Sequence, residues 1–382
     1  MLSNVILPPK CLGILGGGQL GRMFIIAARQ MGYQVAVLEP DINCPAATLA
    51  NYHIKTNYDD KNGLDELANI SDVITTEFEN IPVDSLKYLE NKVPVYPNAS
   101  AILIAQNRLN EKAFFNSLGI PTTKYLPIDN QTDINNIAPD IFPSILKTNT
   151  LGYDGKGQIR VNNIDELSAG FTKLTQRACI LEKLIDIKLE VSVIVARSQN
   201  EVVVYPVSQN IHKNGILDIT IAPANIDKQL QDQITAYAIA IINKLNYIGV
   251  LAIEFFITKD DQIIANEMAP RPHNSGHHTI DANITSQFEQ QVRAICNLKL
   301  GSTLPNSKAI MLNLLGDIWL NETTPPNFEG VLSKYDNLKL HLYDKQIANI
   351  GRKMGHLTML GDNIELLLQQ INEIKLELGI KS

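Results

Sequence analysis

The hydrophobic and polar positions of this chain follow two different patterns, which predict two kinds of sheet. In the first third, the short apolar runs LGILG, QVAVLEP, VITTEF and VPVYP predict strands, and a helical pattern over 22–31 follows the first of them. Strands that alternate with helices over short connections indicate a parallel α/β sheet. We therefore expect the N-terminal part of the chain to form such a sheet.

In the middle of the chain, apolar runs lie close together with turn residues between them. The segments 189–197, 201–209 and 249–258 predict antiparallel strands, and helical patterns cover 164–175 and 228–246. The change of pattern indicates a second domain, of α+β type, after the first.

The segment 301–308, GSTLPNSK, has the composition of a linker. A small β-rich region follows it and ends in an amphipathic helix over 364–378. With boundaries near residues 110 and 300, we expect three domains, at 1–110, 111–300 and 301–382. The expected fold class is thus α/β and α+β together.

Composition places the chain among globular proteins and narrows its partners. Of 382 residues, 45% are hydrophobic and 19% are charged, which excludes disordered, collagen-like and disulfide-scaffold classes. The net charge of −7 argues against nucleic acid as the main partner. The start MLSNVILPPK does not have the pattern of a signal peptide, and no run has the length of a membrane span. Four scattered cysteines indicate reduced thiols, so we expect a cytoplasmic protein.

The first candidate for chemistry is the glycine loop at 16–21, GGGQLG, which fits G-x-G-x-x-G. It follows a predicted strand and opens a helix, and Glu39 ends the next strand, as in dinucleotide-binding domains. An NAD-dependent dehydrogenase is therefore one hypothesis, and a plain tight turn is its structural alternative. The segments that follow do not resemble a hydride-transfer site.

A second glycine loop, at 150–158, follows Lys147 at the end of the predicted strand SILK. Three glycines with Lys156 can form a flexible flap whose backbone amides wrap phosphate groups. Both lysines can add positive charge where phosphoryl charge develops. The alternative is a mobile hairpin tip with a solvated lysine, and the loop does not match the Walker pattern.

Two glutamates are predicted to face each other on neighbouring strands. If the turn between the strands centres between Asp260 and Asp261, Glu254 and Glu267 are opposite partners. Opposed like charges destabilise a sheet unless something neutralises them. Two hard oxygen ligands beside a phosphate flap suggest Mg²⁺. One shared proton, or a glutamate paired with Arg271, is the alternative.

Other polar residues add weaker signals. Glu190 alternates with the apolar positions of its strand, so it can face a ribose hydroxyl, while Glu182 can accept from an adenine amino group. For these two and for His212, an ordinary strand or surface role is the alternative. The run 269–278, APRPHNSGHH, is dense in donors and follows Glu267, which indicates an anionic-substrate site or else a solvated loop.

A basic cluster near the C-terminus is the last candidate. It consists of Lys345, Arg352, Lys353 and His356. A charge run is usually a solvated face, and in an acidic protein it can instead form the phosphate end of a substrate pocket.

Taken together, the motifs GGGQLGRM, TEFENIP, GYDGKGQ, NEMAPRPHNSGHHT and GRKMGH, in this order, resemble the ATP-grasp superfamily. Within it the chain is similar to the 5-(carboxyamino)imidazole ribonucleotide synthase family over nearly its whole length. The resemblance implies a Rossmann-like N-terminal domain that does not bind NAD, a central ATP-grasp domain, a small C-terminal domain and a homodimer.

The activity that the resemblance implies is that of a carboxylate-amine ligase of purine (IMP) biosynthesis. ATP and bicarbonate carboxylate the 5-amino group of 5-aminoimidazole ribonucleotide, via carboxyphosphate, with release of ADP and phosphate. The rival hypotheses are a formate-using ligase of the glycinamide ribonucleotide type, the NAD-dependent dehydrogenase and a non-catalytic scaffold.

The resemblance also implies the role of particular residues. The catalytic residues are expected to be Arg271, Lys147 and Asp154. The ATP site is expected to comprise Arg108, Lys147, Gly152, Tyr153, Asp154, Gly155, Lys156, Gly157, Gln158, Glu182, Lys183, Leu184, Ile185, Glu190, His212, Asn266 and Glu267. The site for bicarbonate and the ribonucleotide is expected to comprise Gln19, Leu20, Glu77, Tyr153, Asp154, Arg271, His273, Asn274, Ser275, Lys345 and Arg352. Glu254 and Glu267 are the expected Mg²⁺ ligands.

The chain departs from the family pattern in three places. Leu151 stands where many members have glycine, Ala269 stands where many other ATP-grasp enzymes have a metal-binding asparagine, and Asn349 and Ile350 interrupt a stretch that is often Arg-Pro. We expect a stiffer flap, a metal site that depends on the two glutamates, and a less basic C-terminal loop.

Overall fold

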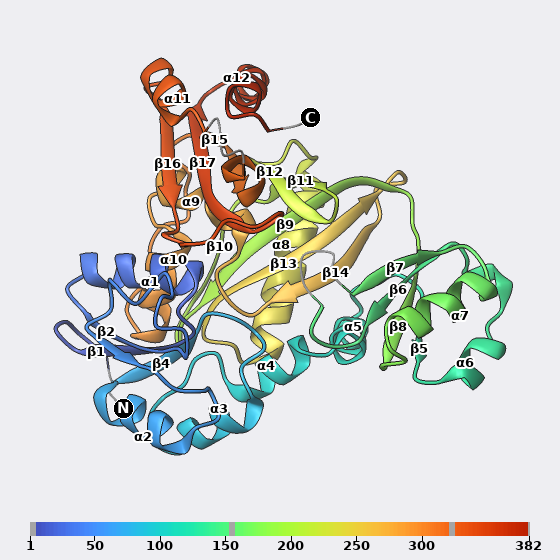
Figure 1. Cartoon of the computed structure of the whole chain (residues 1–382), viewed down its shortest axis with the longest axis horizontal. Helices are drawn as coiled ribbons and strands as arrows, with labels where there is room; N and C mark the ends of the chain where they lie inside the picture. Colours follow the sequence, from blue (N-terminus) through green and yellow to red (C-terminus); the bar gives the residue numbers. More distant parts are fainter. Residues whose placement is uncertain (1–4, 153–156, 321–324, 381–382) are drawn as a thin grey trace.

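The computed structural model describes residues 5–152, 157–320 and 325–380, whose strands form three sheets (Figure 1). The first sheet has the order β3-β2-β1-β4 and is parallel throughout, which confirms the α/β expectation. Its strands β1 to β4 are Cys11–Leu15, Gln34–Leu38, Tyr52–Ile54 and Val73–Thr76. The helices α1 to α5 of this region are Gln19–Gln30, Lys61–Ile70, Val83–Glu90, Ala99–Ala105 and Arg108–Ser117.

One predicted strand of this region is wrong. Among the described residues, the run VPVYP makes a single isolated bridge, between Val95 and Ile74. Pro94 and Pro97 have no N–H group to donate to a ladder. The run therefore lies beside β4 without forming a strand of the sheet.

The largest sheet has nine strands, in the order β14-β13-β9-β11-β12-β15-β17-β16 with β10 beside β9. Its pairings are antiparallel, as expected for the middle of the chain. The sheet also continues past residue 300, because β15 pairs with β12. The strands β9 to β17 are Ile187–Arg197, Val202–Val204, Ser208–Lys213, Ile216–Ala222, Gly249–Thr258, Ile263–Ala269, Lys308–Leu315, Leu338–Leu342 and Lys353–Gly361.

The segment 201–209, predicted as one strand, contributes to two. It supplies β10 and the first residues of β11, with Pro206 between them. Both strands pair with β9 along the same edge, Val204 with Val195 and Ser208 with Ser192. Pro206, which cannot donate to a ladder, lies at the interruption between them.

The two faces of this sheet differ in character. One face carries Val191, Val193 and Val195, which pack in a core with α8 (Lys228–Lys244). The opposite face carries a row of polar residues across neighbouring strands, because side chains alternate along each strand. Register pairs join Glu254 to Ser192, and Asn210 to both Glu190 and Thr220. The polar face is where a site can form.

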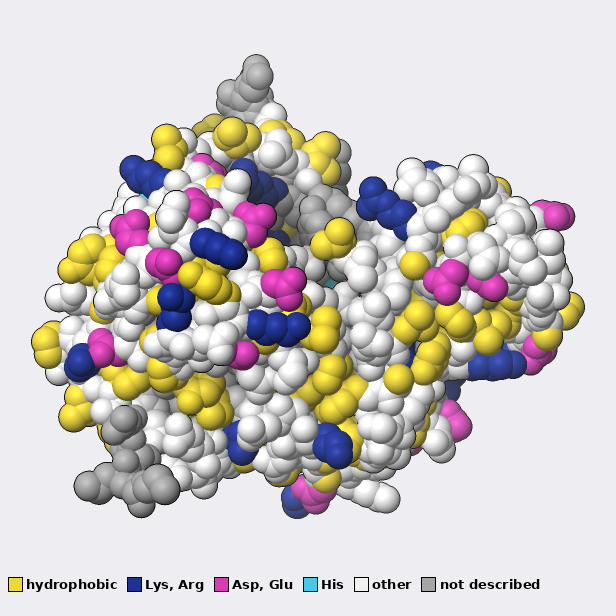
Figure 2. All heavy atoms as spheres, turned by 90° about the horizontal axis from the view of Figure 1, so that it is seen from below, with side chains coloured by type: hydrophobic (Ala, Val, Ile, Leu, Met, Phe, Trp, Pro, Cys, Tyr) yellow, Lys and Arg dark blue, Asp and Glu magenta, His cyan; other side chains and the backbone are white. Residues whose placement is uncertain are grey.

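A third sheet, with the order β5-β8-β6-β7, forms a separate lobe with two helices. Figure 1 shows this lobe at one side of the molecule, and Figure 2 shows it projecting from the body with a hollow between them. Its strands β5 to β8 are Tyr125–Ile128, Ser144–Thr148, Gln158–Val161 and Cys179–Lys183, and its helices α6 and α7 are Gln131–Asn135 and Ile164–Lys173.

The remaining elements lie in several parts of the fold. They are the 3₁₀ turns η1 to η3 at Pro139–Ile141, Asn274–Gly276 and Gly316–Trp319, and the helices α9 to α12 at Thr279–Ala282, Gln287–Ile295, Phe328–Lys334 and Ile364–Glu377. The last of these agrees with the predicted C-terminal helix. None of the helices in the described ranges is both long and apolar enough to cross a bilayer.

Three histidines, His277, His278 and His356, are buried between the η2 segment and the C-terminal strands. The His356 ring stacks on His341 and lies 5.0 Å from the His277 ring, and its Nδ1 contacts the Tyr343 hydroxyl at 2.8 Å. Burial lowers the pKa of His277 and His356 well below 6.5 and that of His278 to about 4. These three imidazoles are therefore neutral in the folded protein at neutral pH.

This cluster contributes acid lability to the fold. The unfolded chain binds protons on these histidines below about pH 6.5 and the folded chain does not, so their contribution to the free energy of unfolding falls as pH drops below that value. The carboxyl groups whose pKa is raised, Glu77 and Glu254 to about 7 and Glu111 to about 8, act in the opposite direction. We expect a loss of roughly 1 kcal/mol per histidine per pH unit. Urea denaturation between pH 7.5 and 5.5 measures this slope.

His356→Gln should reduce the slope, while His53→Gln, on the edge strand β3, should leave it unchanged. A slope that is the same in all three proteins would contradict the prediction.

Candidate functional site

Two adjoining cavities, of about 720 and 290 Å³, open over the polar face of the large sheet. They share part of their lining, so they form one connected site. The shared residues are Arg108, Gly152, Glu267, His273, Asn274 and Lys353. The larger cavity is also lined from the N-terminal sheet and from the C-terminal loop, whereas the smaller one is lined from the lobe and from β9, β11, β13 and β14.

The glutamate pair stands opposite as predicted, although the turn alone does not place it. Near the turn, Phe256 pairs with Ile264, and a bulge then shifts the register so that Glu254 pairs with Glu267. The bulge leaves Asn266 as an extra residue on β14. Asn266 and both glutamates consequently line the smaller cavity.

The two carboxyl groups have opposite pKa shifts. Burial and the neighbouring Glu267 raise the pKa of Glu254 to about 7. Burial also acts to raise the pKa of Glu267, but Arg108, whose guanidinium lies 3.0 Å away, and Lys147 outweigh it and lower that pKa. Two carboxylates and an amide are hard oxygen donors, so this donor set fits Mg²⁺. The alternative pairing with Arg271 is wrong, because Arg271 pairs with Glu79.

Lys147 is positioned by a buried charge cluster. Glu182 is only 4% exposed, and its Oε2 lies 3.0 Å from Lys147 Nζ and 3.4 Å from Lys112 Nζ. Burial opposes ionisation of Glu182, but the two lysines dominate and lower its pKa to about 2. Glu182 Oε1 is buried and has no hydrogen-bond partner among the described residues. The role of Glu182 at an adenine amino group therefore stays a prediction, with Oε1 as the available acceptor.

Glu190 and His212 meet in the smaller cavity, as the predicted adenosine site requires. His212 Nδ1 lies 2.5 Å from Glu190 Oε2. Burial acts to lower the pKa of His212, but the hydrogen bond that Glu190 accepts and the negative charges of Glu254, Glu190 and Glu267 together outweigh it, so the pKa is raised.

Other residues of the predicted ATP site are not brought to the shared cavities. Leu184 and Ile185 line a third cavity, of about 860 Å³, at the lobe, and Lys183 Nζ donates to the carbonyl of Asp140.

Of the predicted flap, Tyr153, Asp154, Gly155 and Lys156 lie outside the described residues. Gly152, Gly157 and Gln158 line the smaller cavity. The contribution of these residues to ATP binding stays a prediction.

The first glycine loop does not have the free amides that a dinucleotide needs. Glu77 accepts hydrogen bonds from the amides of Gly18 and Leu20, and Glu39 accepts one from Gly17. The loop thus holds two carboxylates of its own chain where a pyrophosphate would bind. The dehydrogenase hypothesis is wrong for this physical reason, and Glu39 is not a ribose ligand. Burial raises the pKa of Glu77 to about 7.

The η2 segment presents its polar groups to both cavities. Asn274 is 5% exposed, and its Nδ2 and Oδ1 have no partner among the described residues. His273 Nδ1 contacts Ser275 Oγ at 2.9 Å, and Ser275 Oγ accepts from Ser192 Oγ at 2.8 Å. The unpaired Asn274 amide favours a ligand there, because a buried amide without a partner is costly. The solvated-loop alternative for 269–278 is wrong, since most of the segment is buried.

The C-terminal loop joins the site from a distant part of the sequence. Lys345 Nζ donates to Gln19 Oε1 at 2.7 Å, and Lys345, Arg352 and Lys353 line the larger cavity. Arg352 also donates to the carbonyl of Ile347. His356, grouped with this basic run in the sequence, lies instead in the buried histidine cluster.

Several residues of the site were missed by reasoning from the sequence. Among them are Glu79, Gln106, Glu111 and Lys112. Glu111 and Lys112 follow Arg108 by one helical turn, and Lys112 donates to the carbonyl of Asn266 at 3.1 Å. The helical spacing of these charged residues after Arg108 was the available signal. Glu79 gave a weaker signal, as a second glutamate beside Glu77.

Three family models match this chain. They are the "Ribonucleotide synthetase preATP-grasp domain" over residues 10–106, the "ATP-grasp domain" over 113–288 and the "Phosphoribosylaminoimidazole carboxylase C-terminal domain" over 309–370. The matched ATP-grasp domain contains the lobe, the glutamate pair and the η2 segment. The fold and its two cavities thus define an ATP-grasp enzyme.

Curated relatives and solved structures narrow the class. The chain is 39% identical over 374 residues to the N5-carboxyaminoimidazole ribonucleotide synthase of Bacillus subtilis, covering 97% of each chain. It is 43% identical over 355 residues to that of Brucella melitensis, covering 92% of this chain and 96% of the relative. A structure of the Aspergillus clavatus enzyme with ADP and 5-aminoimidazole ribonucleotide matches with a TM-score of 0.89 and 30% identity, covering 97% and 98%. The chain belongs to the N5-carboxyaminoimidazole ribonucleotide synthase family, which confirms the resemblance.

The packing of the glycine loop predicts a sharp effect of one added methyl group. A Cβ at residue 18 would lie 2.3 Å from Glu77 Oε1, which the backbone amides hold in place. We expect Gly18→Ala to lower the free energy of unfolding by about 1–3 kcal/mol, because overpacking displaces Glu77. Urea denaturation measures it.

Gly170→Ala is the matched control, because Gly170 lies within α7 and a Cβ there makes only ordinary contacts, with side chains of β6 and β7. It should leave stability equal or raise it by about 0.5–1 kcal/mol. Equal stability of Gly18→Ala and the unmodified protein would contradict the account of the loop.

Proposed function

We propose that the connected cavities use ATP and bicarbonate to carboxylate the 5-amino group of 5-aminoimidazole ribonucleotide, with carboxyphosphate as the intermediate. One observation carries this proposal: the two cavities share Glu267, Arg108 and the unpaired Asn274. A phosphoryl donor bound in the smaller cavity and an anion bound in the larger one are therefore in direct reach of each other. The relative with ADP and 5-aminoimidazole ribonucleotide supports both substrates.

The proposed reaction has two steps. A bicarbonate oxygen attacks the terminal phosphorus of ATP, the bond from phosphorus to the bridging oxygen breaks, and ADP leaves. The exocyclic amine then attacks the carbon of carboxyphosphate or of the CO₂ that it releases, and phosphate carries away the bonding electron pair. Arg271 and Asn274 hold the anion, while Lys147 and Arg108 offset charge on the phosphoryl group. Phosphate or a nearby side chain takes the amine proton.

Glu254 and Glu267 are proposed to hold Mg²⁺, with Asn266 beside them. The bound cation supplies positive charge to the polyphosphate of ATP. The same two carboxylates lie opposite each other and are partly buried, so they would otherwise repel, and the cation also offsets this repulsion.

Further parts of the assignment are proposed from the resemblance. Lys345 and Arg352 take the 5′-phosphate of the ribonucleotide, and their place in the larger cavity beside Gln19 supports this. The domain limits 1–110, 111–300 and 301–382, a homodimer and a cytoplasmic location complete the proposal.

The substrate assignment predicts the dependence of phosphate release. Phosphate should form from ATP only when bicarbonate and 5-aminoimidazole ribonucleotide are both present, because the amine consumes the intermediate. A coupled phosphate assay with each component omitted in turn measures this. Release that does not depend on the ribonucleotide, or release that formate supports in place of bicarbonate, would contradict the proposal.

The metal assignment predicts the effect of Glu267→Gln. Loss of a ligand carboxylate should lower kcat by more than about 100-fold, which is the upper range for removing a residue that only supports a ligand. It should also weaken Mn²⁺ binding in the presence of ADP, measured by electron paramagnetic resonance.

Glu289→Gln is the matched control, because Glu289 pairs with Arg293 on α10 and does not line either cavity. It should retain full activity and Mn²⁺ binding. Unchanged Mn²⁺ binding in Glu267→Gln would contradict the metal assignment.

A further inference from the structure

Arg271 lies in a part of the larger cavity that is crowded with carboxylates. Glu79, Glu77 and Glu267 all raise the pKa of its guanidinium, although burial opposes them. A flexible arginine in such surroundings has several partners to choose from, including Glu267, the proposed metal ligand. The function proposed for Arg271 requires one orientation among these.

The backbone on either side of Arg271 is rigid. Pro270 and Pro272 flank the residue, and the amide of Arg271 donates to the carbonyl of Ala269 at the end of β14. Each proline fixes its own φ and restricts the backbone of the residue before it. The backbone is therefore fixed, and only the side-chain torsions of Arg271 can still vary.

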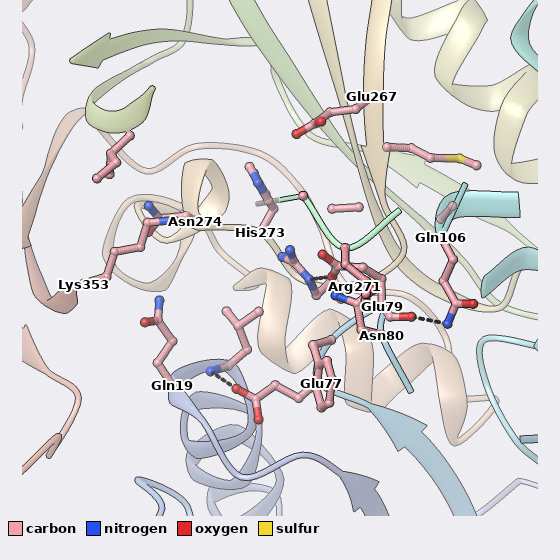
Figure 3. A pocket seen from close by; sticks show the side chains of 18 of the residues that line it. Gln19, Glu77, Glu79, Asn80, Gln106, Glu267, Arg271, His273, Asn274 and Lys353 are labelled. Atoms are coloured by element: carbon pink, nitrogen blue, oxygen red, sulfur yellow. Dashed lines mark hydrogen bonds and ion pairs between the residues drawn. The ribbon is translucent and has the colours of Figure 1, made fainter. Parts of the chain in front are cut away.

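Glu79 restricts the orientation of the Arg271 side chain. Its Oε2 accepts from Arg271 Nε at 2.7 Å (Figure 3). The Nη1 group of Arg271 donates to the carbonyl of Pro272 at 3.3 Å. Among the described residues, Nη2 has no hydrogen-bond partner and is available to an anion in the cavity. Because a guanidinium is planar, a carboxylate held at Nε fixes the plane in which the other nitrogens lie.

Glu79 is itself anchored to a different part of the chain. It lies between β4 and α3, and the side-chain amide of Gln106, at the end of α4, donates to the carbonyls of Glu79 and Ile81 at 2.7 and 2.8 Å. Burial acts to raise the pKa of Glu79, but Arg271 outweighs it and lowers that pKa, so the group is ionised at neutral pH. Glu79 thus brings a fixed negative charge from the N-terminal sheet to the arginine.

We propose that Glu79 is a positioning residue, which holds the Arg271 guanidinium in the orientation that binds the bicarbonate-derived anion and keeps it from Glu267. This inference rests on the function proposed above for Arg271. It predicts a selective defect, because Glu79 touches neither the nucleotide lining nor the glutamate pair.

The test is steady-state kinetics of Glu79→Gln, which keeps the shape of the side chain and removes its charge. We expect kcat/KM for bicarbonate to fall about 10–100-fold, since misplacement of a binding group by about 1 Å has an effect of this size. KM for ATP should change by less than about threefold, and Glu79→Asp should restore part of the loss. Asp218→Asn is the matched control, because Asp218 forms a similarly buried ion pair with Lys375 outside both cavities.

A double-mutant comparison separates this inference from the proposed function. If Glu79 acts through Arg271, Glu79→Gln should have little further effect in an Arg271→Lys background. An equal effect in both backgrounds, or an unchanged bicarbonate kcat/KM in Glu79→Gln, would overturn the positioning role alone. An Arg271→Lys enzyme with an unchanged KM for bicarbonate would instead overturn the role proposed for Arg271, and this inference with it.

Discussion

The repulsion between two partly buried carboxylates on adjacent strands is the constraint around which the rest of the site is arranged. Glu254 and Glu267 face each other on the polar side of a sheet whose other side is a hydrocarbon core. In such surroundings two like charges must be neutralised by protons, by cations of the protein or by a metal. The chain supplies Arg108 and Lys147 on the side of Glu267, and leaves Glu254 with a pKa near neutrality.

The need to neutralise these carboxylates explains why residues far apart in the sequence lie close together in the site. Arg108 comes from α5, Lys147 from the lobe, and Lys345 reaches Gln19 from a loop more than three hundred residues away. The continuous nine-stranded sheet makes this possible, because its last strands carry the C-terminal loop to the edge of the same cavity. The N-terminal sheet is joined to this assembly by contacts such as Arg271 with Glu79 and Gln291 with Thr75.

The glycine loop shows how one local pattern can serve a different purpose. Its glycines allow close approach, as they do in dinucleotide-binding domains, but the group that approaches is Glu77 of the same chain. A side chain at Gly18 would meet the carboxyl group of this one residue before any other atom. A helix N-terminus attracts anions, and here the anion is the Glu77 carboxylate of the same chain. The loop and Glu77 thus hold each other in place where they line the larger cavity.

The sequence by itself determined the kind of sheet in the N-terminal and middle parts of the chain, the placement of Glu254 and Glu267 on neighbouring strands and the ordered motifs that identify the family. These depend on periodicity, turn chemistry and local spacing, which are properties of short segments. The tertiary structure alone decided which charges meet. Glu79 reaches Arg271, Lys112 reaches Glu182, and His356 leaves the basic run for a buried stack. Such contacts join residues far apart in the chain, so their electrostatics depend on packing and burial that local patterns do not contain.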